Sequence, residues 1–103
     1  MPGYKTLLAY QKAKQVADEI FIVSKTFPPE EKYSLTDQIR RSSRSVCACI
    51  SEAYRKRKYP AHFVSKLTDS DMENGETEVW LDFAKDCNYL TVEKHTRLYS
   101  LND

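Results

Sequence analysis

Residues 27–60 read FPPEEKYSLTDQIRRSSRSVCACISEAYRKRKYP and hold one long amphipathic stretch between two proline breaks. Pro28 disfavours helical backbone in the residue before it, and neither it nor the proline that follows can donate to a continuing helix. A new helix is therefore expected to start at Ser34, whose hydroxyl suits an N-cap with Asp37 three residues on. The small and apolar side chains of this helix recur at alternating steps of four and three residues, at Leu35, Ile39, Ser42, Val46, Cys49 and Ala53. The spacing predicts a helix that runs to about Lys58.

The same spacing predicts a helix on each side of this one. The upstream helix covers about residues 5–26, with a stripe of Ala9, Ala13, Val16, Ile20, Val23 and Phe27. The downstream helix begins at Pro60, because the N–H that proline lacks is not needed in a first turn. Its stripe becomes small and polar in the middle: Phe63, Leu67, Ser70, Asn74, Thr77, Leu81 and Ala84.

Two further features of the second half bear on the fold. Gly75 costs about 1 kcal/mol relative to alanine in a helix interior, so something beyond helix propensity favours that region. Thr91 is a fair N-cap for a short fourth helix that carries Val92, His95, Leu98 and Leu101.

The composition agrees with a few long helices. The 103 residues include only two glycines and four prolines, too few to punctuate the strands of a sandwich or barrel. The length leaves room for one core, so we expect a single domain over residues 1–103 and exclude a large enzyme fold. The fold class predicted is all-α, an antiparallel up-down four-helix bundle with a short fourth helix. Either this bundle is uneven or a neighbouring subunit completes it.

The formal net charge of +1 hides two oppositely charged segments. Residues 38–58 carry seven Lys or Arg against Glu52, and residues 69–86 carry seven Asp or Glu against Lys85. The overall balance gives no global field toward nucleic acid or membrane, so any charged site must be local.

Several kinds of site are not expected. No stretch approaches the ~18 apolar residues of a membrane span, and residues 1–10 lack a signal-peptide core, which indicates a cytoplasmic protein with no membrane partner. The odd number of cysteines favours reduced thiols. Cys47 and Cys49 lie about 200° apart on a helix and cannot share a metal ion. His62 and His95 have no catalytic partner at a suitable spacing, and no cofactor motif is present, so we predict no catalytic, metal or cofactor site.

The stretch from Phe27 to Arg57 resembles the family of 23S rRNA intervening-sequence proteins. Members show Leu-Thr-x-Gln-Ile-Arg-Arg, which residues 35–41 match, and the chain then matches without gaps at Ser45, Val46, Ile50, Glu52 and Tyr54. Residues 10–13, Tyr-Gln-Lys-Ala, are similar to the family's Trp-Gln-Lys-Ala opening, and the resemblance covers about residues 8–90. The chain departs from the family at Ala53, where a glycine is usual, and at Met72-Glu73, where Gly-Ser is usual.

The resemblance implies a bacterial, left-handed four-helix bundle that assembles into a ring-like homopentamer and has no established enzyme activity. One branch of the family, the accessory variability proteins of diversity-generating retroelements, binds nucleic acid and a reverse transcriptase through a basic surface. For this chain the resemblance therefore suggests two kinds of partner besides itself, a nucleic acid and another protein.

Arg40, Arg41 and Arg44 are the first candidates for phosphate contact. The third helix, however, runs back antiparallel from a turn near Tyr59 and brings Glu76 and Glu78 opposite them. We therefore interpret these five residues as structural ion pairs, within the chain or between subunits, with Arg41 paired to one of the two glutamates.

The run from Tyr54 to Tyr59, YRKRKY, has no acidic counterpart across the predicted turn. Antiparallel packing also brings the start of the first helix, with Lys5, to the same end. Consecutive cations can hold phosphates while a tyrosine ring stacks on a base. The predicted nucleic-acid-binding residues are Lys5, Tyr54, Arg55, Lys56, Arg57, Lys58 and Tyr59. The alternative is a solvated helix end on a structural protein-protein interaction module.

Four aromatic residues exceed what the predicted core needs. An apolar patch with an aromatic anchor commonly marks a subunit interface, but each residue taken singly fits a core role equally well. The residues concerned are Tyr10, Trp80, Phe83 and Tyr89.

Overall fold

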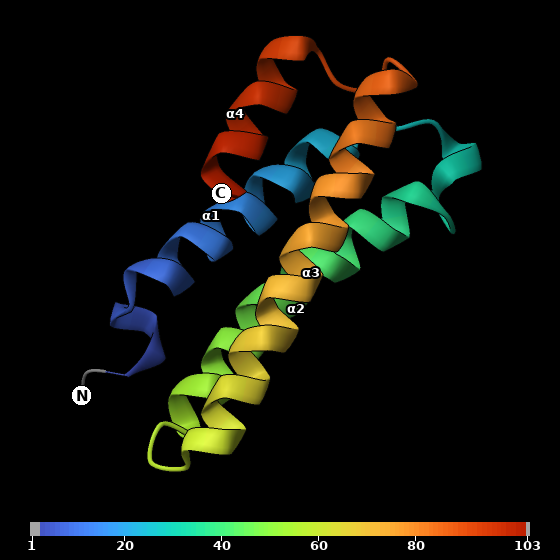
Figure 1. The fold of residues 1–103 in the computed structure, drawn as a ribbon. Helices are drawn as coiled ribbons and strands as arrows, with labels where there is room; N and C mark the ends of the chain where they lie inside the picture. Colours follow the sequence, from blue (N-terminus) through green and yellow to red (C-terminus); the bar gives the residue numbers. More distant parts are fainter. Residues whose placement is uncertain (1–2, 103) are drawn as a thin grey trace.

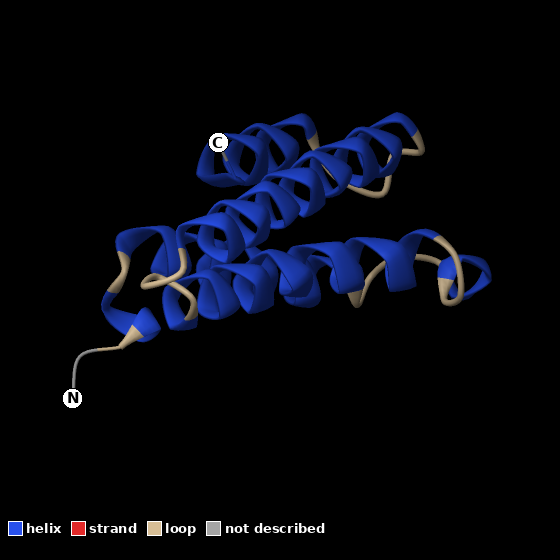
Figure 2. Ribbon diagram, turned by 60° about the horizontal axis from the view of Figure 1, so that its bottom comes forward, coloured by secondary structure: helices blue, strands red, loops and turns tan. Residues whose placement is uncertain are grey.

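The computed structural model describes residues 3–102, and this range is helical without any strand. The helices are α1 (Leu8–Ser24), α2 (Leu35–Arg55), α3 (Pro60–Asp86) and α4 (Val92–Asn102), with short 3₁₀ turns η1 (Tyr4–Thr6) and η2 (Pro29–Glu31). Figures 1 and 2 show the helices packed side by side and joined by short loops. The predicted all-α four-helix fold with a short last helix is confirmed.

The four helices contact each other in a closed cycle. α2 packs against α1 and α3, and α4 packs against the same two helices from the other side. The molecule is elongated, measuring 44 × 21 × 19 Å, and α4 spans only one end of it (Figure 1). The protomer is therefore an uneven bundle, with three long helices and a fourth that covers half their length.

The core gathers at the end that α4 covers. Its side chains come from all four helices and from the loops beside them: Val16, Ile20, Phe27, Leu35, Ile39, Leu81, Ala84, Leu90 and Leu98. Most of these are stripe positions predicted from the alternating steps of four and three residues, because that spacing keeps side chains on one face of a helix. The amphipathic pattern thus fixes which faces meet.

Small polar side chains let α2 and α3 approach closely at mid-length. The hydroxyls of Ser42 and Thr77 are both buried and lie 2.9 Å apart, within hydrogen-bonding distance. Thr77 Oγ1 also lies 2.9 Å from the backbone oxygen of Glu73, and Ser42 Oγ lies 3.4 Å from that of Ile39. The polar centre of the predicted third-helix stripe is therefore matched by a polar residue on its neighbour, which satisfies both buried groups.

Three polar contacts hold the short α4 in place. The Arg97 guanidinium donates to both carboxylate oxygens of Glu19 on α1, at 2.7 and 3.0 Å. His95 Nε2 lies 2.8 Å from Asp82 Oδ1 on α3. Asn74 and Asn102 each donate from the side-chain amide to the other's backbone oxygen, at 2.8 and 3.2 Å.

The helix boundaries confirm some predictions and correct others. Thr91 caps α4 as predicted, since its hydroxyl accepts from the backbone N–H of Lys94 at 3.1 Å. The first helix starts later than expected, at Leu8, because residues 4–6 form the separate turn η1, and it ends at Ser24. α2 ends at Arg55, three residues before the expected end at Lys58.

Ser34 is the N-cap residue of α2 as predicted, but the predicted role of its hydroxyl is wrong. The Ser34 hydroxyl donates to Glu31 Oε1 at 2.6 Å instead of accepting from the helix. The backbone N–H of Leu35 donates to the same carboxylate oxygen at 3.4 Å. The acceptor at the start of α2 is therefore Glu31, which the preceding turn η2 places there.

Candidate nucleic-acid interface

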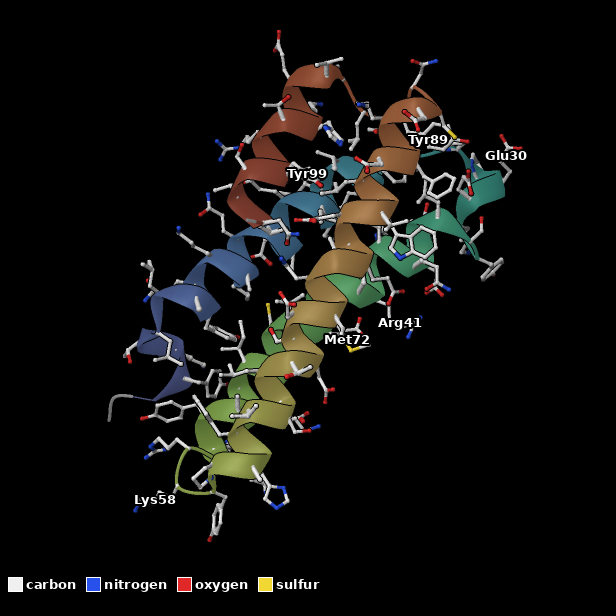
Figure 3. All side chains as sticks on the ribbon, viewed as in Figure 1. Glu30, Arg41, Lys58, Met72, Tyr89 and Tyr99 are labelled. Atoms are coloured by element: carbon white, nitrogen blue, oxygen red, sulfur yellow. The ribbon has the colours of Figure 1, made fainter. Side chains whose placement is uncertain are left out.

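The α2–α3 hairpin ends in a tight turn that carries the basic run. Lys56 closes the last turn of α2 by donating its backbone N–H to the oxygens of Glu52 and Ala53, and the N–H of Tyr59 donates to Lys56 O at 2.8 Å. Pro60 then opens α3, as predicted. The consecutive cations therefore lie around the tip of a hairpin, where Figure 3 shows Lys58.

The side chains of this tip are exposed and lack carboxylate partners. Within the part of the chain that the structure describes, none of Arg55, Lys56, Arg57 and Lys58 forms a salt bridge, and all four are exposed. Tyr59 is 60% exposed. Among residues 3–102, therefore, no carboxylate neutralises the positive charge of the tip.

Two of the cations lie over the tyrosines that flank the run. The Arg57 guanidinium sits 4.1 Å from the ring centroid of Tyr54 and also donates to Tyr54 O at 2.9 Å. The Lys56 ammonium lies 5.9 Å from the Tyr59 ring centroid. Cation–π contacts of this kind orient the side chains without removing their charge.

The turn η1, which contains Lys5, lies at the same end of the bundle, as predicted. η1 contacts α2, and Figure 1 shows it near the hairpin end. Gln11 Nε2 donates to the backbone oxygen of Lys5 at 3.2 Å, which fixes the turn, while the Lys5 side chain is exposed. The rings of Tyr4 and Tyr10 pack edge to face at 4.9 Å.

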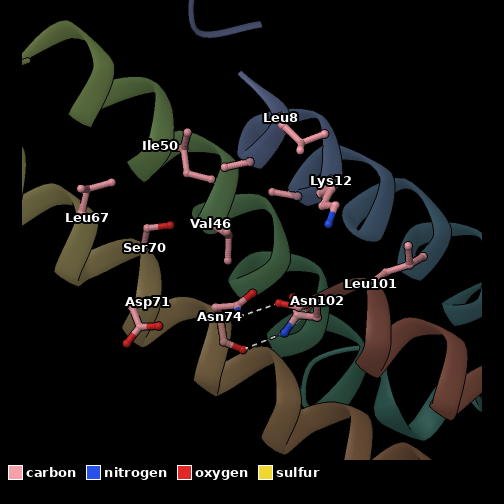
Figure 4. Close-up of a pocket in the computed structure, with 12 residues that line it drawn as sticks. Leu8, Lys12, Val46, Ile50, Leu67, Ser70, Asp71, Asn74, Leu101 and Asn102 are labelled. Atoms are coloured by element: carbon pink, nitrogen blue, oxygen red, sulfur yellow. Dashed lines mark hydrogen bonds between the residues drawn. The ribbon is translucent and has the colours of Figure 1, made fainter. Parts of the chain in front are cut away.

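An apolar groove runs between α1 and α3 beyond the end of α4. One part, of about 450 Å³, starts at the Asn74–Asn102 pair and continues past Val46 and Ile50, with Lys12 and Asp71 also lining it (Figure 4). A second part, of about 410 Å³, extends to the hairpin and is lined by apolar residues together with Tyr54 and Arg57. The groove marks the length over which the bundle has three helices instead of four.

The three arginines predicted to form ion pairs make other contacts. Arg40 Nε donates to Ser24 Oγ at 2.7 Å, and the guanidinium groups of Arg40 and Arg44 lie 4.8 and 5.2 Å from the Phe21 ring centroid. Arg41 donates to Gln38 Oε1 at 2.8 Å.

Glu76 and Glu78 are not their partners within the chain. Glu76 accepts from Trp80 Nε1 at 3.3 Å, and no salt bridge joins either glutamate to an arginine among the residues described. The predicted intrachain pair of Arg41 is therefore wrong, because Arg41 lies on the outward side of α2 (Figure 3) while Ser42 occupies the contact with α3. The ion pair that joins α2 to α3 is Glu52–Lys66, at 2.8 Å.

The arginines instead border a basic groove on the outer side of α2, of about 630 Å³. Lys32 and Tyr33 of the preceding loop complete it, and Ser45 and Ala48 line it together with Arg40, Arg41, Arg44 and Asp37. Lys32 and Tyr33 were not predicted from the sequence, because helical periodicity does not tell where a loop lies relative to the helix that follows it.

All four surplus aromatic residues have partners inside the protomer. Trp80 and Tyr89 pack against the core, and Tyr10 packs on Tyr4. The Tyr89 hydroxyl donates to Glu31 Oε2 at 2.9 Å, which raises the pKa of Tyr89 to about 12. The Phe83 ring centroid lies 6.0 Å from that of Trp80, but Phe83 remains 53% exposed.

The titratable groups include a His–Asp contact: Asp82 Oδ1 lies 2.8 Å from His95 Nε2, although no partner was predicted for His95 from the sequence. No group of three or more His, Cys, Asp or Glu within residues 3–102 is placed to hold a metal ion. Burial raises the pKa of the Cys47 and Cys49 thiols, which makes both poor nucleophiles. None of the helices described is long and apolar enough to cross a membrane.

The chain is similar to a known protein family and to a solved structure. The sequence model of the 23S rRNA-intervening sequence protein family matches residues 5–103. A crystal structure of a protein of unknown function from the S23 ribosomal protein family of Bacteroides thetaiotaomicron is 29% identical, with a TM-score of 0.81 over 92% of this chain and 85% of that one. A search of curated proteins finds no match.

Proposed function

The chain belongs to the 23S rRNA-intervening sequence protein family, and from this premise we propose that it is an oligomeric, non-enzymatic protein that binds RNA or DNA. The binding surface is the hairpin tip, with Arg55, Lys56, Arg57 and Lys58 on the phosphates and Tyr54, Tyr59 and Lys5 beside them. The observation that supports this proposal is that the four consecutive cations are exposed and have no carboxylate partner among the described residues.

The chemistry of the tip favours backbone recognition over sequence reading. Lysine and arginine contacts to phosphates position a protein on nucleic acid but carry no direct sequence information. The exposed ring of Tyr59 can stack on any unpaired base, since every base has a π face. We therefore expect binding with little sequence preference.

The remaining parts of the proposal follow the family. We place the protein in the bacterial cytoplasm as a single domain that assembles into a homopentamer. Repetition of the hairpin tip around such a ring would let several tips engage one long nucleic acid, so that weak contacts combine into firm binding.

The first prediction tests the tip directly. Arg55, Lys56, Arg57 and Lys58 are all replaced by glutamine, and affinity for an rRNA fragment and a DNA duplex is measured by fluorescence anisotropy at 50 and 200 mM salt. With four phosphate contacts, wild-type affinity should fall about 10²-fold between the two salt concentrations. The variant should bind much more weakly at 50 mM and lose most of this salt dependence.

A charge-matched control separates the tip from the general charge of the protein. Lys12, Lys14, Lys25 and Lys94 are exposed and lie away from the tip, so their replacement by glutamine changes the net charge equally. This control should retain the affinity of the wild type. Unchanged binding by the tip variant would refute the nucleic-acid proposal.

A protein-protein interaction module is the second candidate, and the apolar groove favours it. Leu8 at the rim is 66% exposed, and the lining of apolar side chains suits an amphipathic helix of a partner. Such binding depends on apolar burial and should change little with salt. The salt series therefore distinguishes the two candidates.

A further inference from the structure

α3 carries a second apolar face that points away from the bundle. Val64, Met72, Val79 and Phe83 are 59, 68, 48 and 53% exposed. With Thr68 and Gly75 they follow steps of four, four, three, four and four residues, which places them along one line of the helix. The buried residues Ser70, Thr77, Leu81 and Ala84 lie on the other side of α3. An apolar line of this length on an exposed helix indicates a packing surface.

Gly75 lies on this outer line between Met72 and Val79. A Cβ built at this glycine would meet nothing within 4 Å, and its φ is not positive, so neither the packing nor the backbone of the protomer requires glycine here. Glycine nevertheless weakens a helix interior relative to alanine. Because Gly75 has no side chain, the backbone of a second helix could approach α3 closely at this point. This would explain the glycine, which the protomer alone does not explain.

The charges beside this line indicate the kind of surface against which it can pack. Asp71 and Asp86 are exposed beside it, and Glu76 lies on its other flank. Asp82 lies on the same side as Asp71 but already contacts His95 of α4. Two α3 faces packed against each other would bring these carboxylates together, and like charges in contact are unfavourable. The outer face of α3 therefore fits a surface that is basic and has room for a helix.

The basic groove on α2 has both properties. Arg41 and Arg44 are exposed on its sides, and neither forms a salt bridge within the described chain. Ser45 and Ala48, two small side chains, line the groove together with them. Tyr33, 84% exposed, and Lys32 border it from the loop.

We propose that the outer face of α3 of one copy docks into the basic groove on α2 of the next copy. This inference rests on the oligomeric part of the proposed function and names the two surfaces involved. Arg41 and Arg44 of one copy form ion pairs with carboxylates of α3 of the other copy. The outer line of α3 packs into the groove at Gly75. Because the two faces differ and each copy carries both, the contact repeats head to tail, which is the kind of contact that a closed ring such as the proposed homopentamer requires.

Charge reversal tests the contact, with the mass measured by sedimentation. Wild-type protein should sediment as a multiple of the 12.0 kDa protomer. Arg41→Glu with Arg44→Glu should sediment as the protomer, and so should Asp71→Lys with Glu76→Lys. The protein that carries all four substitutions should recover the mass of the wild type, because each face again meets its opposite. Lys94→Glu, at an exposed position on α4 away from both faces, is the control and should leave the mass unchanged.

A second variant tests the close approach at Gly75 without altering charge. Gly75→Trp should retain the circular dichroism of the wild type, since the protomer has open space there, but should sediment as the 12.0 kDa protomer. Ser100→Trp, at an exposed position on α4, should keep the assembly.

Several outcomes would overturn the inference, and each points elsewhere. Loss of assembly in the α3 variants alone would indicate a two-fold α3–α3 contact. An unchanged mass with weaker nucleic-acid binding after arginine reversal would make the groove a phosphate site. A wild type that sediments at 12.0 kDa would refute the oligomer itself. An assembled wild type with unaffected variants would refute only these surfaces, and the glutamine variant of the hairpin tip tests nucleic-acid binding separately.

Discussion

At the scale of single residues, the buried hydroxyls of Ser42 and Thr77 fix how closely α2 and α3 pack. Thr77→Val keeps the volume but removes a hydroxyl that reaches both Ser42 and the backbone of Glu73. We predict a loss of about 1–2 kcal/mol in the free energy of unfolding, measured by urea denaturation. Thr26→Val is the matched control, because the Thr26 hydroxyl is exposed and donates only to the backbone oxygen of Val23, three residues earlier, at 2.8 Å. An equal loss of unfolding free energy in both variants would show that the buried contact does not stabilise the fold.

A second residue-scale prediction concerns Glu31, whose carboxylate joins the start of α2 to Tyr89. Hydrogen bonds from Ser34, then Tyr89, hold the pKa of Glu31 below its ordinary value of 4.5. A lowered pKa in the folded state means that the stabilisation is present above pH 4.5 and is lost as the pH falls through the folded value. Glu31→Gln should therefore melt at a lower temperature than wild type at pH 7, and the difference should shrink as the pH falls below 4.5. A difference that stays constant with pH would contradict this.

At the scale of elements, the spacing of apolar residues was enough to predict four helices and the faces they bury. It was not enough for charged contacts. Helix periodicity places Arg41 on a side of α2, but whether that side faces α3 is known only once the buried side is known. The contact between α2 and α3 where the ion pair was expected is occupied by the small side chains of Ser42 and Thr77. Similarly, the cap from Glu31 depends on how η2 folds back, which a search for a serine N-cap does not consider.

α3 shows a second limit of sequence reading at this scale. The inner stripe was predicted as the buried one, and the structure confirms it at Ser70, Thr77, Leu81 and Ala84. The outer line through Val64, Met72, Val79 and Phe83 also has a helical period, but it was not recognised from the sequence as a second apolar face. The cost of Gly75 in mid-helix was visible in the sequence as an unexplained feature. Its position on the exposed line supplies a reason that involves a second copy rather than the protomer. The charge of the hairpin tip, by contrast, could be predicted, since a tight turn leaves few positions for a carboxylate to reach it.

At the scale of the whole molecule, assembly and nucleic-acid binding should depend on each other. The hairpin tip lies at one end of a 44 Å protomer, away from the middle of α3 where Gly75 lies, so a substitution at Gly75 should leave each tip intact. A ring would nevertheless present several tips to one long strand, and linked sites bind more tightly than single ones by factors of about 10² to 10⁴. Gly75→Trp should therefore weaken binding to a long rRNA fragment at least tenfold.

Binding to a short oligonucleotide is the control for this prediction. A strand of about six nucleotides can engage only one tip, so wild type and Gly75→Trp should bind it with equal affinity per protomer in fluorescence anisotropy. Equal weakening on short and long strands would place the middle of α3 in direct contact with nucleic acid. Equal binding of the long fragment by both proteins would mean that one tip suffices, and the assembly would then need a role other than gathering tips onto one strand.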